Sequence, residues 1–180
     1  MVDRLKIVRI FADSNTLFSF HYENEEDNEY DRNIELWTNP EELLKFAKTH
    51  VKVTDYSKYV EERLEDAEQI IDLVEKLATD KTIKLEHFFE PLSEKEYSIK
   101  LLSFQKGKTK HSYRRNDLRF YAIRIDENLF VLTGGAIKVS QAMQESENTQ
   151  KELDKLKKAK LYLQENGVFD NDSFFELIAQ

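Results

Sequence analysis

Two apolar runs in the second half of the chain constrain its fold more than any other feature. LRFYAIRI (118–125) and NLFVLTGG (128–135) are rich in β-branched and aromatic residues, which favour strands. The residues where the two runs meet, 126–128, are Asp, Glu and Asn, and this polar link favours a turn. The sequence therefore predicts a β-hairpin across residues 118–135, and with it a sheet that the rest of the chain must cover.

Further periodic segments define the other expected elements. Apolar and β-forming residues on both sides of ADSN predict an N-terminal hairpin, and helical caps with apolar periods of three to four predict helices. The expected strands are 5–12, 16–22 and 96–104, and the expected helices are 37–50, 56–78, 148–167 and 172–178. This order of hairpin, two helices, three strands and two helices indicates an α+β fold.

Local signals mark several element ends. Asn39 can cap the helix that opens at Pro40, since proline suits the first helical position. Thr149 and Glu152 have the spacing of a capping box, and Gly167 suits the end of the same helix. The acidic run ENEEDNEYD (23–31) lacks an apolar period, so we predict a solvated loop there.

Length and composition bound the class of protein. The 180 residues, 40% of them hydrophobic and none of them cysteine, suit a single domain, divided into an acidic portion 1–90 and a sheet-rich portion 91–180. No apolar run approaches the ~20 residues of a membrane span, and no secretory signal is recognised, so we expect a cytoplasmic protein. The four histidines show no metal-ligand spacing, and we expect neither a metal nor a cofactor.

Charge is distributed very unevenly along the chain. The net charge is -8, but residues 1–99 carry 13 Lys/Arg against 24 Asp/Glu, whereas residues 100–124 carry eight Lys/Arg against Asp117 alone. A concentrated basic block can bind the phosphates of nucleic acid. It can equally pair with the acidic half of the same molecule, and charge alone leaves the two interpretations with equal weight.

Alternation along 118–125 adds an aromatic ring to this block. Arg119 and Tyr121 share one face with Ile123 and Ile125, because side chains in a strand alternate between faces. Arginine binds phosphate, and a tyrosine ring can stack on an unpaired base. The strand therefore predicts an RNA contact at its first residues, if the basic block faces outward.

The adjacent glycines Gly134 and Gly135 interrupt the second strand of the hairpin. A glycine costs stability inside a strand, and the chain has only four. No GxGxxG or GxxxxGK[ST] phosphate loop is present, although a backbone nest for one phosphate remains possible. We interpret the pair as a bulge or bend that turns Lys138 toward the face of Arg119 and Tyr121.

The second half resembles the RelE/ParE/HigB toxin superfamily over about residues 91–166. The segments that carry the likeness are, in order, PLSEKEYSIKLLS, LRFYAIRI, NLFVLTGGAIKVSQAMQ and the charged helix NTQKELDKLKKAKLYLQ. HigB-like members likewise show an "ELR"-type strand, an arginine–tyrosine strand, an apolar strand that runs into a lysine-bearing segment, and a helix. The twin lysine of those members is reduced here to Lys138, because Val139 follows it.

The resemblance implies a small twisted antiparallel sheet flanked by helices. It also implies an endoribonuclease that cuts mRNA on the ribosome without a metal and is silenced by an antitoxin protein. Arg119 and Lys138 match the family's basic residues, and Tyr121 would stack on a base or relay a proton. The residues expected to bind flanking RNA phosphates are Lys100, Lys108, Lys110, Arg114, Arg115 and Arg124.

Two other functions fit the same frame. The chain would be a non-catalytic RNA- or protein-binding module if the catalytic set is incomplete, or a ParE-like inhibitor that binds its target without cutting RNA. About 90 N-terminal residues precede the toxin-like part, and their net charge is strongly negative. This negative charge opposes approach to RNA. One interpretation of this portion is an attached regulator that covers the basic face.

Overall fold

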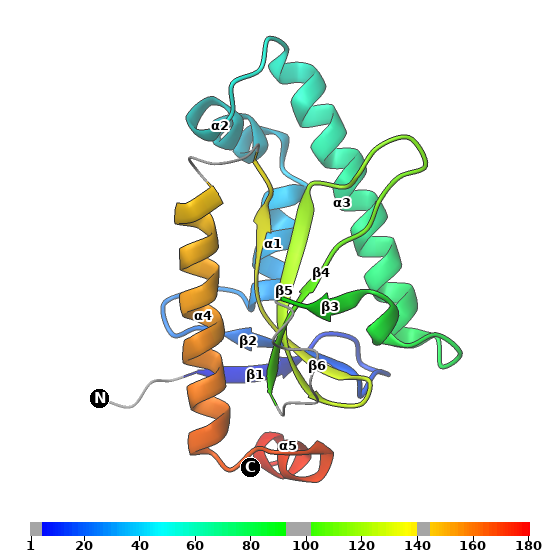
Figure 1. The fold of residues 1–180 in the computed structure, drawn as a ribbon, viewed down its shortest axis with the longest axis vertical. Helices are drawn as coiled ribbons and strands as arrows, with labels where there is room; N and C mark the ends of the chain where they lie inside the picture. Colours follow the sequence, from blue (N-terminus) through cyan, green and yellow to red (C-terminus); the bar gives the residue numbers. More distant parts are fainter. Residues whose placement is uncertain (1–4, 93–101, 140–144) are drawn as a thin grey trace.

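The strands assemble into one mixed sheet in the order β1-β2-β6-β5-β4-β3 (Figure 1). This computed structural model describes residues 5–92, 102–139 and 145–180. The strands are β1 (Lys6–Arg9), β2 (Leu17–His21), β3 (Phe89–Pro91), β4 (Ser103–Gly107), β5 (Leu118–Asp126) and β6 (Leu129–Ile137). The helices are α1 (Glu29–Trp37), α2 (Pro40–His50), α3 (Tyr56–Thr79), α4 (Glu145–Glu165) and α5 (Asn171–Ile178), with a 3-10 turn at Leu85–His87.

The predicted α+β class and both predicted hairpins are confirmed. β1 pairs with β2, and β5 with β6, in antiparallel fashion, and β4 and β3 continue the antiparallel order. The sheet departs from the expected antiparallel form at one place, because β2 pairs with β6 in parallel. This pairing joins strands more than 100 residues apart, and local patterns carry no signal for it.

The ends of two helices agree with local sequence signals, and two other predicted element ends differ from the structure. The Asn39 side chain caps α2 by accepting bonds from the amides of Glu41 and Glu42 at 3.0 and 3.4 Å, as predicted. Gly167 adopts φ +74° just after α4, also as predicted. The capping box at Thr149 is wrong, because α4 already begins at Glu145. Residues 96–101 of the predicted strand lie outside the described residues, and β4 continues three residues beyond its predicted end.

The loop prediction for residues 23–31 is wrong at its end, since α1 begins at Glu29. The Asn28 side chain accepts a bond from the Asp31 amide at 3.1 Å and so caps the helix. The helix buries Tyr30, Asn33 and Trp37. Acidic residues flank Tyr30 on both sides, and the buried Asn33 is polar, so the start of the helix shows no apolar period in the sequence.

Helices cover both faces of the sheet (Figure 1). On one face, α1, α2 and α3 bury Trp37, Leu43, Ile70, Phe120 and Phe130 in a common core. On the other face, α4 and α5 pack over a second core, whose largest members are Phe18, Phe20, Ile123, Leu156 and Phe174. The predicted alternation of β5 is confirmed, because Phe120 and Ala122 join the first core, and Ile123 and Ile125 the second.

The two adjacent glycines let helices approach both faces of β6. The register of β5 and β6 shifts next to Gly134, as the predicted bulge requires. A Cβ atom at Gly134 would lie 2.0 Å from Glu152 Oε2 of α4, and one at Gly135 would lie 2.9 Å from the Asn33 side chain of α1. Real Cβ contacts are longer than this, so close helix packing explains the pair more fully than the direction of Lys138 does.

A buried polar cluster ties α1 to α4 beside these glycines. Lys155 Nζ lies 2.7 Å from Glu29 Oε1 and 3.3 Å from Glu152 Oε1. Arg32 donates to both oxygens of Glu29 at 2.7 and 3.0 Å. Among the described residues, Glu152 Oε2 is buried and has no hydrogen-bond partner. The two carboxylates therefore have unequal surroundings, although both contact Lys155.

The unequal surroundings predict opposite effects on stability. Burial raises the pKa of Glu152 above 4.5, so the folded state binds this proton more tightly than the unfolded chain does. Stability from Glu152 therefore falls as pH rises from about 4.5 through its folded pKa. We expect Glu152→Gln to raise the melting temperature at pH 7 and to flatten this part of the pH profile.

The matched control is Glu29→Gln in the same cluster. Burial opposes ionisation of Glu29, but Arg32 and Lys155 hold its pKa below 4.5, so its stabilisation is present at pH 7 and is lost as pH falls through the folded pKa. We expect this variant to melt at a lower temperature at pH 7. Thermal melts between pH 4 and 8 check both signs, and a lower melting temperature for Glu152→Gln at pH 7 would contradict the first.

Candidate functional site

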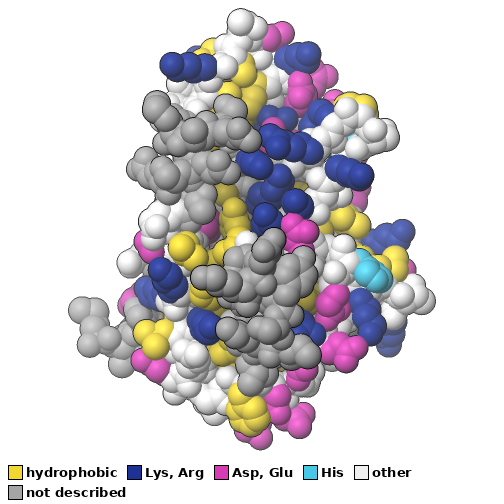
Figure 2. All heavy atoms as spheres, viewed as in Figure 1, with side chains coloured by type: hydrophobic (Ala, Val, Ile, Leu, Met, Phe, Trp, Pro, Cys, Tyr) yellow, Lys and Arg dark blue, Asp and Glu magenta, His cyan; other side chains and the backbone are white. Residues whose placement is uncertain are grey.

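A basic cleft of about 610 Å³ lies between the start of α3 and the adjoining ends of β5 and β6. Lys and Arg side chains gather on this face of the molecule between α3 and the sheet (Figure 2). The charged residues that line the cleft are Lys52, Asp55, Lys58, Glu62, Arg63, Arg115, Asp117 and Lys138. Five cations against three carboxylates favour the binding of an anion.

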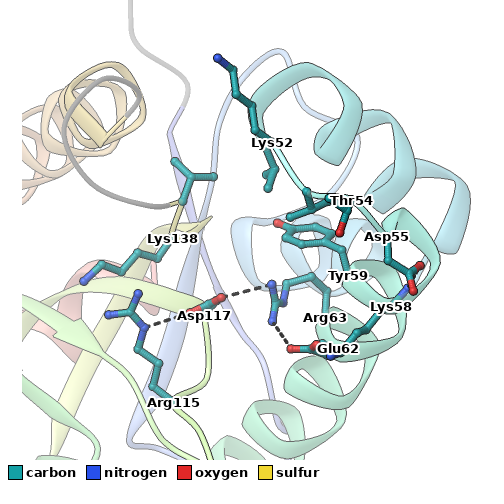
Figure 3. A pocket seen from close by; sticks show the side chains of 13 residues that line it. Lys52, Thr54, Asp55, Lys58, Tyr59, Glu62, Arg63, Arg115, Asp117 and Lys138 are labelled. Carbon is teal, nitrogen blue, oxygen red and sulfur yellow. Dashed lines mark hydrogen bonds and ion pairs between the residues drawn. The ribbon is translucent and has the colours of Figure 1, made fainter.

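Asp117 lies between two guanidinium groups in the cleft (Figure 3). Its Oδ2 is 3.1 Å from Arg63 Nη1, and its Oδ1 is 3.2 Å from Arg115 Nε. The Arg63 side chain is 5% exposed, whereas that of Arg115 is 57% exposed. One guanidinium is therefore fixed in the wall, and the other extends into solvent at the rim.

Main-chain bonds hold this part of the cleft in place. The Asp117 amide donates to Asp66 Oδ2 of α3 at 3.1 Å, and the Asp117 carbonyl accepts from the Lys138 amide at 2.6 Å. Lys138 directly follows the last residue of β6, so the ladder between the two strands continues to the cleft. These main-chain bonds therefore fix where the backbones of Asp117 and Lys138 lie in the cleft.

An aromatic residue of α3 completes the inner wall. The Arg63 guanidinium carbon lies 4.6 Å from the centre of the Tyr59 ring, a distance at which a cation and an aromatic face attract. Tyr59 is buried, and burial raises the pKa of its hydroxyl. The hydroxyl therefore stays protonated at neutral pH and is able to act as a donor.

The cleft contains two of the residues predicted from the sequence, Arg115 and Lys138. Arg119 is not among the described residues that line it. Arg119 is 7% exposed, and its Nη1 donates to the carbonyls of Asn116 and Leu118 at 2.5 and 2.9 Å. Burial lowers the pKa of its guanidinium. Tyr121 is half-buried against the second core, so the predicted pair shares a face of β5 without reaching the cleft.

Most of the basic loop before β5 docks onto acidic side chains. Arg114 Nη1 lies 2.6 Å from Asp66 Oδ1, and its Nη2 lies 3.1 Å from Glu65 Oε2. His111 Nε2 also contacts Asp66 Oδ1, at 2.7 Å. Of the two interpretations of the basic block, pairing within the molecule thus describes Arg114 and His111. Arg115, the next residue, turns into the cleft instead.

The other predicted RNA-binding residues lie apart from one another. Lys108 is 3.2 Å from Glu90 of β3, and Arg124 is 3.7 Å from Glu86. Lys110 is exposed, and its carbonyl accepts from the Gln69 side chain at 2.8 Å. Lys100 lies outside the described residues. The structure therefore places the predicted cations that it describes over several surfaces, and two of these, Arg115 and Lys138, meet in one site.

Sequence reasoning missed the contribution of the acidic portion to this site. Lys52, Lys58, Tyr59 and Arg63 all come from it. One signal was present, because Tyr59, Arg63, Asp66 and Ile70 follow one another at helical spacing and are all buried. An arginine and an aspartate in a row that faces the core indicate a buried ion pair and its partners.

The chemistry open to this cleft is anion binding and proton transfer by side chains. Within residues 5–92, 102–139 and 145–180, no three His, Asp or Glu side chains are grouped so as to hold a metal ion.

Over the same part of the chain, no helix combines the length and apolar character needed to cross a membrane. Comparison with protein-family models, curated proteins and solved structures finds no match to this chain.

Proposed function

We propose that the chain is a toxin-type endoribonuclease that binds and cuts RNA in the basic cleft. The observation that carries the proposal is the position of Lys138. The resemblance to RelE/ParE/HigB toxins singles out this lysine, and it lines a cleft with Arg115, Arg63, Lys52 and Lys58. Five cations around one cleft match the charge of a phosphodiester chain.

The proposed reaction is attack by a ribose 2'-hydroxyl on the adjacent phosphorus. The bond from O2' to phosphorus forms as the bond from phosphorus to O5' breaks, leaving a 2',3'-cyclic phosphate and a 5'-hydroxyl. Glu62, which lines the cleft, accepts the 2'-hydroxyl proton, and Lys138 donates a proton to the leaving oxygen. Arg115 offsets the charge that develops on the phosphate oxygens.

The test is cleavage of labelled single-stranded RNA by purified protein in EDTA. We expect products that end in a 2',3'-cyclic phosphate, and a rate about 100-fold lower for Lys138→Ala, since a positioned proton donor contributes about this factor. Lys157→Ala is the matched control, because Lys157 is exposed on α4 and lies outside the cleft. Intact RNA under all conditions, with harmless expression of the wild type in cells, would contradict the proposal.

The proposal extends to the cellular setting. A toxin of this type acts in the cytoplasm on mRNA at the ribosome, and an antitoxin protein silences it. A neighbouring reading frame for a small DNA-binding antitoxin would support this setting. Growth arrest without RNA cleavage would instead favour a ParE-like inhibitor that binds its target.

A second candidate is a non-catalytic RNA-binding module. The state of Arg119 favours it, because this match to the family's basic residues donates to two backbone carbonyls and is 7% exposed. A module of this kind would bind RNA in the cleft and leave it intact. Binding measured by fluorescence anisotropy, together with the cleavage assay, separates the two functions.

A further inference from the structure

The carboxylate of Asp117 is the one anion that bridges the two arginines of the cleft among the described residues. It faces Arg63 Nη1 at 3.1 Å and Arg115 Nε at 3.2 Å (Figure 3). A phosphate with two oxygens bound by two guanidinium groups needs the same arrangement of donors. The position of this carboxylate therefore marks where a phosphate would bind most favourably.

We propose that Asp117 occupies the phosphate subsite of the cleft and is displaced when a polyanion binds. The inference rests on the proposed function for the identity of the polyanion as RNA, but the displacement itself concerns only phosphate and Asp117. In the free protein the carboxylate contacts both Arg63 and Arg115 and offsets part of their charge. A phosphate group takes its place, and the Asp117 side chain turns outward.

The surroundings of Asp117 permit this exchange without a change in the fold. Its side chain is 22% exposed, so a path to solvent exists. Its fixed contacts are main-chain bonds, to Asp66 and from Lys138, and these persist when the side chain rotates. Arg63 keeps its 2.9 Å contact with Asp66, so the inner guanidinium remains in place.

Displacement makes the cleft selective for anions that carry several phosphates. A single small anion gains Arg63 and Arg115 but must expel a carboxylate that is already bound to them. A chain of phosphates also reaches other cations of the cleft, such as Lys52, Lys58 and Lys138, and these contacts offset the loss of the Asp117 bridge. Asp117 therefore discriminates against free phosphate and favours a polymer.

The test is the affinity of the full chain for inorganic pyrophosphate, measured by isothermal titration calorimetry. We expect Asp117→Asn to bind pyrophosphate about tenfold more tightly than the wild type, because a like charge is removed from the subsite. Asp55→Asn is the matched control. It removes one negative charge from the same cleft, and asparagine can still cap α3 by accepting from the Lys58 amide.

Three results would overturn the inference. These are an unchanged or weaker affinity for folded Asp117→Asn, an equal gain for Asp55→Asn, and a gain that persists when Arg115→Gln is added to Asp117→Asn. If Asp117→Asn does not fold, an NMR titration of the wild type replaces it. Saturating pyrophosphate must then shift the resonance of Arg115 Nε. Tighter pyrophosphate binding without RNA cleavage would support the displacement while contradicting the nuclease.

Discussion

Asp66→Ala is expected to lower the free energy of unfolding by about 3–5 kcal/mol, the usual cost of breaking a buried ion pair from one side. The Asp66 carboxylate is fully buried and accepts from Arg63 at 2.9 Å, from Arg114 at 2.6 Å and from the Asp117 amide at 3.1 Å. Its removal leaves the buried Arg63 with weaker partners and releases the basic loop from α3. Chemical denaturation measures the loss.

Asp72→Ala is the control for this prediction. Asp72 lies on the same helix but is exposed, and surface substitutions usually change stability by no more than about 0.5 kcal/mol. A second consequence follows for the cleft, because the Asp117 amide loses its anchor. Asp66→Ala should therefore weaken phosphate binding even at temperatures where the protein is folded. A stability equal to that of Asp72→Ala would show that the network contributes little.

Gly134→Val is expected to destabilise the protein by about 3 kcal/mol, at the upper end of the cost of overpacking. Even the first added carbon would lie 2.0 Å from Glu152 Oε2 and 3.0 Å from Glu152 Cδ. The carboxylate cannot move away freely, because Glu152 shares Lys155 with Glu29. Either α4 shifts from the sheet or the buried cluster breaks, and thermal and chemical melts report both.

A double mutant identifies the contact responsible. Glu152→Ala removes the atoms that a side chain at position 134 would strike, so Gly134→Val combined with Glu152→Ala should cost less than the sum of the single changes. Coupled neighbours depart from additivity by about 0.5–3 kcal/mol. Strict additivity would show that the glycine is required for the backbone of β6 and not for the approach of α4.

Local sequence patterns predicted the elements that are marked by alternating apolar residues, polar turns or apolar rows at helical spacing. The hairpin of β5 and β6 has alternating apolar residues and a polar turn, and α3 has its apolar row from Val60 to Ala78. The start of α1 was missed because acidic residues surround Tyr30. The parallel pairing of Leu17–Ser19 with Phe130–Leu132 was missed because it depends on a contact between distant segments.

The candidate site was predicted only in part, for a physical reason. Charge counted along the chain identified Arg115, and the resemblance to toxins identified Lys138. Charge alone could not show that Arg114, next to Arg115, is neutralised by Asp66. Nor could it show that the acidic portion supplies Lys52 and Arg63. Net charge describes a segment as a whole, whereas a binding site depends on the few side chains that remain directed at one cavity.

The position of β6 between β2 and β5 has a consequence for how this chain can be divided. β2 and helices α1 to α3 come from the acidic portion. β2 pairs with β6, and the three helices cover Phe120 and Phe130 of the sheet-rich portion. A protein truncated to residues 91–180 would therefore expose one apolar face of its strands and would keep only one side of the cleft. Loss of the first 90 residues would therefore unfold the sheet-rich portion rather than release it, because the two portions share one core.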